Sequence, residues 1–142
     1  MEKVDLKRSM ARLVDKTMLI DDSDIDLFIH RRFLELCHFS KELISCRSGE
    51  SALDMLRNLN SEPPPDIIFL DLNMPVMDGF SFLTHFMALP AKVKNHTRIV
   101  VLTSSNSPTD RQQVFLYKNV IEMITKPLKQ SDIETLRFLV TA

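Results

Sequence analysis

The segment Asp66-Ile-Ile-Phe-Leu-Asp71-Leu-Asn-Met-Pro75-Val-Met-Asp78-Gly79 contains an unbroken apolar run, residues 67–70, that follows three prolines and ends at the carboxylate Asp71. The run is too short for a helix and does not alternate with polar residues, so it predicts a strand buried on both faces of a parallel sheet. Open α/β sheets bind their ligands at the carboxyl ends of their strands, which makes Asp71 a candidate site residue. A lone aspartate after a strand would more often simply begin a solvated turn.

Apolar runs and helical patterns alternate along the rest of the chain. Four further runs predict strands, at residues 17–20, 43–46, 98–102 and 120–124. The helical patterns between them begin near four capping serines, Ser23, Ser48, Ser107 and Ser131. Residues 89–96 are expected to be a polar connection, and residues 1–16 an N-terminal extension before a domain over residues 17–142. Five strands alternating with five helices predict an α/β fold, a five-stranded parallel sheet in a doubly wound three-layer α/β/α sandwich.

The first predicted helix of the domain carries most of its apolar residues on one stripe, which comprises Ile25, Phe28, Ile29, Phe33, Leu36 and Cys37. This spacing predicts that the stripe packs on the sheet and that His30 lies near the surface. Ser23 is expected to cap the helix, with Asp26 completing a weak capping box. Phe28, Phe82 and Phe86 are expected in the core.

Composition and charge exclude several classes of protein. The net charge of −1 gives no electrostatic basis for binding nucleic acid or an anionic membrane. No apolar run approaches the roughly 20 residues that span a bilayer, and the N-terminus lacks a secretory signal. The two glycines, Gly49 and Gly79, cannot form a Rossmann or Walker phosphate loop. Cys37 and Cys46 lack C-x-x-C spacing and are typical of reduced, packed thiols, so a cytoplasmic protein is expected.

Four of the predicted strands end in polar side chains that would meet at one edge of a parallel sheet: Asp21 and Asp22, Asp71, Thr103, and Lys126. At about 4 Å and an effective dielectric of about 20, each pair of like charges costs on the order of 4 kcal/mol. The carboxylate cluster therefore needs a cation, and oxygen ligands with room for water favour Mg²⁺. A carboxylate nucleophile beside a metal, an ammonium group and a hydroxyl suits phosphoryl transfer.

Taken together, these segments resemble the receiver domain of two-component response regulators, the phosphoacceptor module with a flavodoxin-like fold. The matching segments are Leu19-Ile-Asp-Asp22, Asp71-Leu-Asn-Met-Pro75 through Met77-Asp-Gly79, Leu102-Thr103-Ser, and Lys126-Pro127. The resemblance covers roughly residues 17–142. The local sequence is most similar to stand-alone, chemotaxis-regulator-like receivers of Bacteroidetes-type bacteria.

The resemblance implies a Mg²⁺-dependent reaction in which a sensor histidine kinase or a phosphotransfer protein phosphorylates Asp71. Asp22 and Asp71, with the backbone carbonyl of Asn73, would ligate the metal, and Asp21 would hold a metal-bound water.

The resemblance also implies roles for residues on the last two strands. Lys126 would pair with the phosphoryl group, Thr103 would move to hydrogen bond it, and the Lys126-Pro127 bond would be cis. Met123 stands where the family usually has an aromatic switch residue.

The expected function is that of a single-domain response regulator, a switch and not an enzyme. We expect no second domain after Ala142, so the output is expected to come from binding an unknown downstream protein, with no direct contact to nucleic acid or membrane. One alternative is a phosphorelay intermediate that passes the phosphoryl group to another histidine. Another is a Mg²⁺-dependent phosphatase with an aspartyl nucleophile, but Asn73 stands where haloacid-dehalogenase-type enzymes need a second aspartate. A receiver that binds partners without phosphorylation is a further alternative, although all chemical positions are filled.

Overall fold

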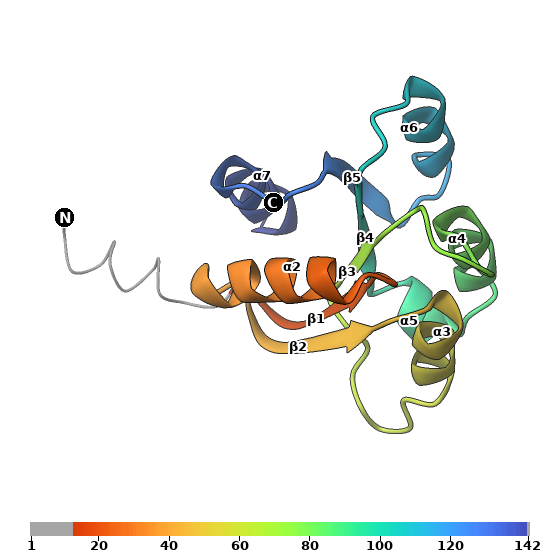
Figure 1. The fold of residues 1–142 in the computed structure, drawn as a ribbon. Helices are drawn as coiled ribbons and strands as arrows, with labels where there is room; N and C mark the ends of the chain where they lie inside the picture. The colour runs from red at the N-terminus through yellow and green to blue at the C-terminus, as the bar shows by residue number, and fades with distance from the viewer. Residues whose placement is uncertain (1–12, 142) are drawn as a thin grey trace.

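A computed structural model of the chain describes residues 13–141 (Figure 1). Five strands form one parallel sheet in the order β2-β1-β3-β4-β5, with bounds β1 Val14–Ile20, β2 Ser40–Cys46, β3 Ile67–Leu70, β4 Arg98–Thr103 and β5 Val120–Thr125. The described residues contain six helices, α2 Asp24–Leu36, α3 Gly49–Arg57, α4 Gly79–Phe86, α5 Ala91–Lys94, α6 Pro108–Val114 and α7 Gln130–Thr141. The predicted α/β fold with a five-stranded parallel sheet is confirmed.

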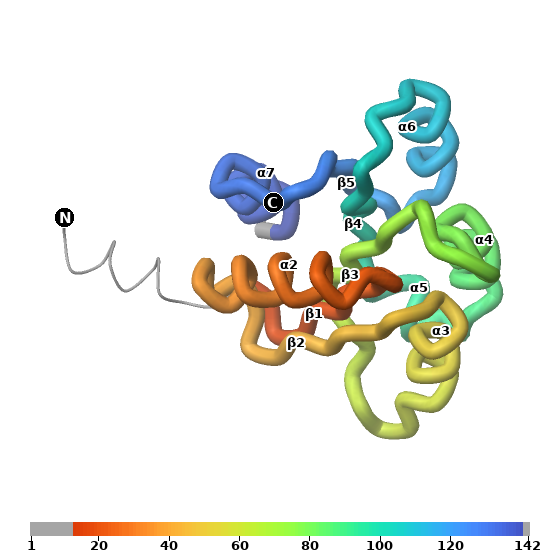
Figure 2. The backbone as a smooth tube through the Cα atoms, viewed as in Figure 1, coloured from red at the N-terminus to blue at the C-terminus, as the bar shows by residue number. Residues whose placement is uncertain are grey.

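The sheet separates two layers of helices, as the tube in Figure 2 shows. Helices α3, α4, α5 and α6 cover one face, and α2 and α7 cover the other. Each residue of β3 is buried, with Ile68 and Leu70 in the first core and Ile67 and Phe69 in the second. This burial on both faces is why the strand reads as a continuous apolar run. Across residues 13–141, no helix combines the length and apolar character that crossing a bilayer requires.

One helix was missed, and strands β1 and β2 each begin three residues before their expected starts, at Val14 and Ser40. Residues 89–96 are not a plain connection, because the short helix α5 lies within them and its Val93 is fully buried against the core. The two strands extend together because Val14 of β1 pairs with Ser40 of β2. The Asp66 carboxylate also accepts hydrogen bonds from the backbone N–H groups of Asp15 and Lys16, at 3.1 and 2.9 Å. Residues 1–12 of the expected extension lie outside the described part of the chain.

Four residues of the apolar stripe that was predicted to pack on the sheet face solvent instead, whereas its other two, Phe33 and Cys37, are partly buried and pack against the core. Ile25 is 71% exposed, Phe28 70% and Leu36 64%, and Ile29 is also exposed. The helix packs on the sheet through Leu27, His30 and Leu34, so His30 is buried and not near the surface. Helix α2 carries two apolar stripes, and periodicity alone cannot decide which one meets the sheet. We call the four exposed residues Ile25, Phe28, Ile29 and Leu36 the α2 apolar face. Phe82 and Phe86 are buried as predicted, whereas Phe28 is not.

Candidate functional site

Three carboxylates lie together where β1 and β3 end. Oxygen atoms of Asp21, Asp22 and Asp71 lie within 4.8 Å of one another, with Asp21 and Asp71 buried and Asp22 exposed. The register of the sheet causes this convergence, because Ile20 of β1 pairs with Leu70 of β3 and the next residue of each strand is an aspartate. The backbone N–H of Asp71 also donates to the carbonyl oxygen of Ile20, at 3.1 Å.

This set of ligands fits a hard divalent cation. All three donors are carboxylate oxygens, three protein ligands leave coordination positions for water, and the exposed side of Asp22 opens the cluster to solvent. Burial raises the pKa of Asp71 above its ordinary value, although the charge of Lys126 acts in the opposite direction. Burial therefore disfavours the ionised carboxylate, and a bound cation would favour it. Asn73 lies beside Asp71 and donates its backbone N–H to Asp71 Oδ1, at 3.4 Å.

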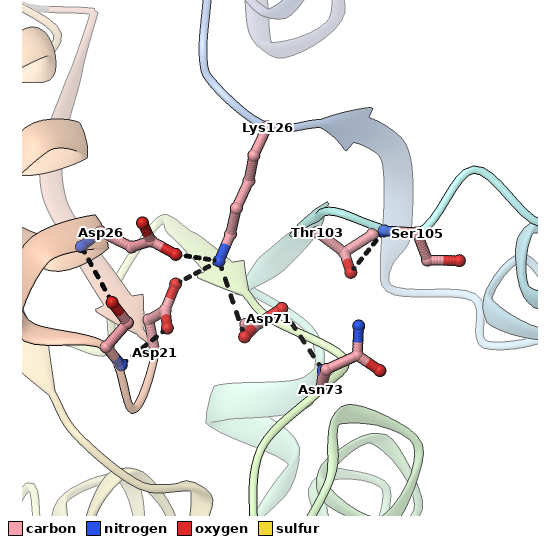
Figure 3. A network of polar contacts seen from close by, with 8 residues as sticks. Asp21, Asp26, Asp71, Asn73, Thr103, Ser105 and Lys126 are labelled. Atoms are coloured by element: carbon pink, nitrogen blue, oxygen red, sulfur yellow. Dashed lines mark hydrogen bonds and ion pairs between the residues drawn. The ribbon is translucent and has the colours of Figure 1, made fainter.

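Lys126 directs its ammonium group into the carboxylates from the end of β5 (Figure 3). Its Nζ lies 2.7 Å from Asp21 Oδ2, 2.7 Å from Asp26 Oδ2 and 3.6 Å from Asp71 Oδ2. Burial lowers the pKa of Lys126, but the hydrogen bonds to Asp21 and Asp26 more than reverse this, so the pKa lies above its ordinary value. Lys126 is therefore a cation throughout the neutral range. The peptide bond to Pro127 is cis, as predicted.

Asp26 belongs to the site, although the sequence placed it only in a helix cap. Ser23 Oγ does accept a hydrogen bond from the Asp26 backbone N–H, at 3.2 Å. The other half of the expected capping box is missing, because the Ser23 N–H donates to Asp21 Oδ1 instead, at 3.0 Å. This leaves the Asp26 carboxylate free to bond Lys126. If the buried face of α2 had been identified correctly, Asp26 would have been a candidate site residue. It directly precedes Leu27 and lies one turn before His30, and both of these residues are buried.

Thr103 ends β4 and is fully buried beside the site. Its hydroxyl oxygen accepts a hydrogen bond from the backbone N–H of Ser105, at 3.2 Å, and its carbonyl oxygen accepts one from the N–H of Lys126, at 2.9 Å. Ser105 in turn donates its hydroxyl to the carboxylate of Asp110 in α6, at 2.7 Å. The hydroxyl that was predicted to contact a phosphoryl group is thus engaged with the β4–α6 loop in this structure.

The loop between Asp71 and α4 is closely packed. A Cβ atom on Gly79 would lie 2.7 Å from both the Asp71 carbonyl oxygen and the Leu72 Cα, so this position requires glycine. The Gly79 N–H donates to the Leu72 carbonyl oxygen, at 2.9 Å. At the tip, Met77 donates its N–H to the Pro75 carbonyl oxygen, at 2.7 Å, in a tight turn that places Val76 at a φ of 67°. The start of α4 therefore holds the backbone of the site in place.

A buried histidine lies behind the carboxylates. His30 Nε2 has no hydrogen-bond partner among the described residues, and a cavity of about 10 Å³, lined in part by His30, Asp21, Asp26 and Asp71, lies next to it. This volume is about that of one water molecule. Burial, followed by the charge of Lys126, lowers the pKa of His30, so the imidazole is neutral at neutral pH.

Comparisons with known proteins point to one family. A family model described as the response regulator receiver domain matches residues 17–136. A two-component response regulator from Cytophaga hutchinsonii is 30% identical, with 89% of this chain and 96% of that chain covered and a TM-score of 0.83. The Mn(2+)-bound form of response regulator Rcp1 is 27% identical, with 87% and 88% covered and a TM-score of 0.68.

Curated relatives are similar over only part of their length. The sensor histidine kinase CheAY of Helicobacter pylori is 34% identical over 110 residues, which is 78% of this chain but 13% of that protein. The chain likewise spans 7% of the hybrid signal transduction histidine kinase L of Dictyostelium discoideum and 19% of the two-component response regulator ORR26 of Oryza sativa subsp. japonica. The similarity thus concerns one domain of larger proteins from bacteria, plants and amoebae.

Proposed function

The chain belongs to the response regulator receiver domain family, and from this premise we propose that Asp71 accepts a phosphoryl group from a sensor histidine kinase or a phosphotransfer protein. A carboxylate oxygen of Asp71 would form the new bond to phosphorus. The bond from phosphorus to the donor's histidine nitrogen would break, and that nitrogen would keep the electron pair. The result would be an acyl phosphate on Asp71 and a free histidine on the donor.

One observation supports this proposal above the others, namely the buried Asp71 carboxylate between two further carboxylates and a lysine. Asp22, Asp71 and the backbone carbonyl of Asn73 would ligate Mg²⁺, and Asp21 would hold a metal-bound water. When bound, the metal would offset negative charge on the phosphoryl oxygens. The Mn(2+)-bound neighbour Rcp1 is consistent with a divalent cation in a domain of this fold.

The proposed output is a change in binding to a downstream protein. Lys126 would pair with the phosphoryl group, and the Thr103 hydroxyl would leave the Ser105 N–H to bond it. The loop that leads to α6 would then lose one of its anchors, which would alter the surface formed by α6, β5 and α7. Met123 is buried in the core beside this surface and would have to transmit the change by repacking, since no aromatic side chain stands there. We place this switch in the cytoplasm, where its donors would present phosphohistidine.

The direct test is chemical labelling of the purified protein with acetyl phosphate and Mg²⁺. We expect one phosphoryl group per chain, and peptide mapping by mass spectrometry should locate it on Asp71. The carboxylate would attack phosphorus and acetate would leave. A label that maps to any other residue, or no label at all, would contradict the proposed function.

The α2 apolar face is the proposed docking surface for the phosphoryl donor. Helix α2 begins three residues after Asp21, so its first turns border the site directly. Ile25, Phe28 and Ile29 occupy neighbouring positions on its solvent side and are all exposed. Exposed apolar side chains grouped beside a reactive site are typical of a protein-binding surface. A helical partner with its own apolar stripe would fit this face.

Replacing Phe28 with alanine should slow phosphotransfer from the partner kinase about ten- to thirtyfold, because an aromatic anchor of an interface typically contributes 1–2 kcal/mol or more. Acetyl phosphate labelling of the Phe28→Ala protein should stay at the wild-type rate, since no partner surface is involved. The assay would use a panel of autophosphorylated histidine kinase domains from the same genome. Phe138→Ala is the matched control, because Phe138 on α7 is similarly exposed, at 74%. An equal loss with Phe138→Ala, or no loss with Phe28→Ala, would refute this docking surface.

A further inference from the structure

We propose that Asp26 is a positioning residue for phosphoryl transfer, which holds the Lys126 ammonium group beside Asp71; this inference rests on the function proposed above. Asp26 is not one of the three clustered carboxylates and does not contact Asp71 through any described hydrogen bond. Its carboxylate has one described side-chain partner, the Nζ atom of Lys126, at 2.7 Å. Any effect on Asp71 must therefore pass mainly through the lysine.

The geometry around Nζ indicates what Asp26 does. An ammonium group has three N–H donors. Two of them are used at 2.7 Å, by Asp21 and Asp26, while Asp71 Oδ2 lies at 3.6 Å, beyond hydrogen-bond length. In Figure 3 the two bonded carboxylates lie on one side of Nζ and Asp71 lies on the other. The third donor is thus available on the side of Asp71, where a phosphoryl group that extends beyond the carboxylate would find it already oriented.

Asp21 and Asp26 are not equivalent anchors. Asp21 belongs to the cluster that fits a divalent cation, so its charge would be shared with the cation whenever one is bound. Asp26 lies outside the cluster, and its charge would stay available to Lys126. In the metal-bound state, which is the state that reacts, Asp26 would therefore be the principal counter-ion that holds the lysine.

Asp26 is itself held rigidly. Its backbone N–H donates to Ser23 Oγ in the first turn of α2, at 3.2 Å, and the next residue, Leu27, is buried against the core under that helix. Lysine has a long and flexible side chain, so an anchor on a fixed helix restricts it far more than contact with solvent would. Orientation of a charged donor before the reaction lowers the barrier for phosphoryl transfer, because no ordering is then needed during the reaction.

The test measures the initial rate of Asp71 labelling by acetyl phosphate at saturating Mg²⁺. We expect Asp26→Ala to slow labelling about tenfold, since a loosened catalytic group loses part of the benefit of its orientation. Asp26→Asn should also slow it, because the amide keeps the shape but not the charge. Asp24→Ala is the matched control, as it removes the same charge from the same helical turn while its partner is the exposed Arg47, at 2.9 Å. This control should label at the wild-type rate.

A second measurement separates positioning from a structural role. In a Lys126→Ala background, Asp26→Ala should cause no further slowing, because its effect acts through the missing lysine. The inference is overturned if Asp26→Ala labels at the wild-type rate, if Asp24→Ala is equally slow, or if the loss is the same without Lys126. If the wild-type protein itself does not label on Asp71, the proposed function fails instead, so the two failures are distinguishable.

Discussion

Asp71→Asn is expected to reduce labelling by acetyl phosphate to background. An amide has no carboxylate oxygen that can attack phosphorus, so the loss should be complete and not partial. Asn keeps the size and shape of the side chain, and it can still accept the hydrogen bond that the Asn73 N–H donates to Asp71 Oδ1. The measurement is the intact mass of the protein after incubation with acetyl phosphate and Mg²⁺, followed over time.

Two controls make this result specific. The label on the wild-type protein should be removed by hydroxylamine, which cleaves an acyl phosphate but not a phosphoserine. Burial raises the pKa of Asp71 in the folded protein. In the absence of metal, the folded state therefore loses stability as the pH rises through this raised pKa and the carboxylate ionises. Asp71→Asn removes this charge, and its urea midpoint at pH 7 in chelator should not be lower than that of the wild type. Labelling of Asp71→Asn at the wild-type rate would show that the phosphoacceptor lies elsewhere.

Removal of Mg²⁺ with excess chelator should slow labelling about a hundredfold or more, because a metal at the reacting oxygens contributes several kcal/mol to phosphoryl transfer. The three carboxylates within 4.8 Å repel an incoming phosphate unless a cation compensates them, and the described ion pairs join Lys126 to only two of them, Asp21 and Asp71. Added Mg²⁺ should restore the rate. In the absence of phosphodonor it should also raise the melting temperature, since it binds the folded state.

Asp22→Asn provides the matched test of the metal site. Asp22 is exposed, and none of the described ion pairs joins it to Lys126, so its replacement removes one negative charge from the carboxylate cluster while the lysine contacts stay in place. We expect the variant to need a higher Mg²⁺ concentration for half-maximal labelling. Full labelling in excess chelator, or an unchanged Mg²⁺ requirement in Asp22→Asn, would count against the metal role.

The sequence predicts the centre of the site well because strand ends are easy to locate. Asp21, Asp71 and Thr103 each follow or end a continuous apolar run, and Lys126 follows a largely apolar one that is interrupted by Glu122. A parallel sheet brings all such ends to one edge. No side-chain detail is needed for that inference. The strand order and the parallel register place these residues at the same edge of the sheet.

What the sequence could not predict depends on the rotation of helices. Both stripes of α2 are apolar, so Leu27 and Phe28 are equally good candidates for the core, and only packing against the sheet selects Leu27. For the same reason the sequence did not predict the role of Asp26, which bonds Lys126 across a separation of 100 residues in the sequence. Helix α5 was missed for a different reason, since it has four residues and no side chain caps its start at Pro90.

The close contact between Gly79 and the backbone of Asp71 has a mechanical consequence. The backbone of Asp71 packs directly against the main chain at Gly79, and these main-chain atoms cannot move apart without breaking the hydrogen bond from the Gly79 N–H to the Leu72 carbonyl oxygen. By contrast, the segment after Thr103 is held by side-chain hydrogen bonds, from the Ser105 N–H to the Thr103 hydroxyl and from the Ser105 hydroxyl to the Asp110 carboxylate, and such bonds can exchange partners readily. Asp71 therefore has one stiff neighbour and one compliant neighbour, and we expect a group added to its carboxylate to displace the compliant segment, which leads to α6.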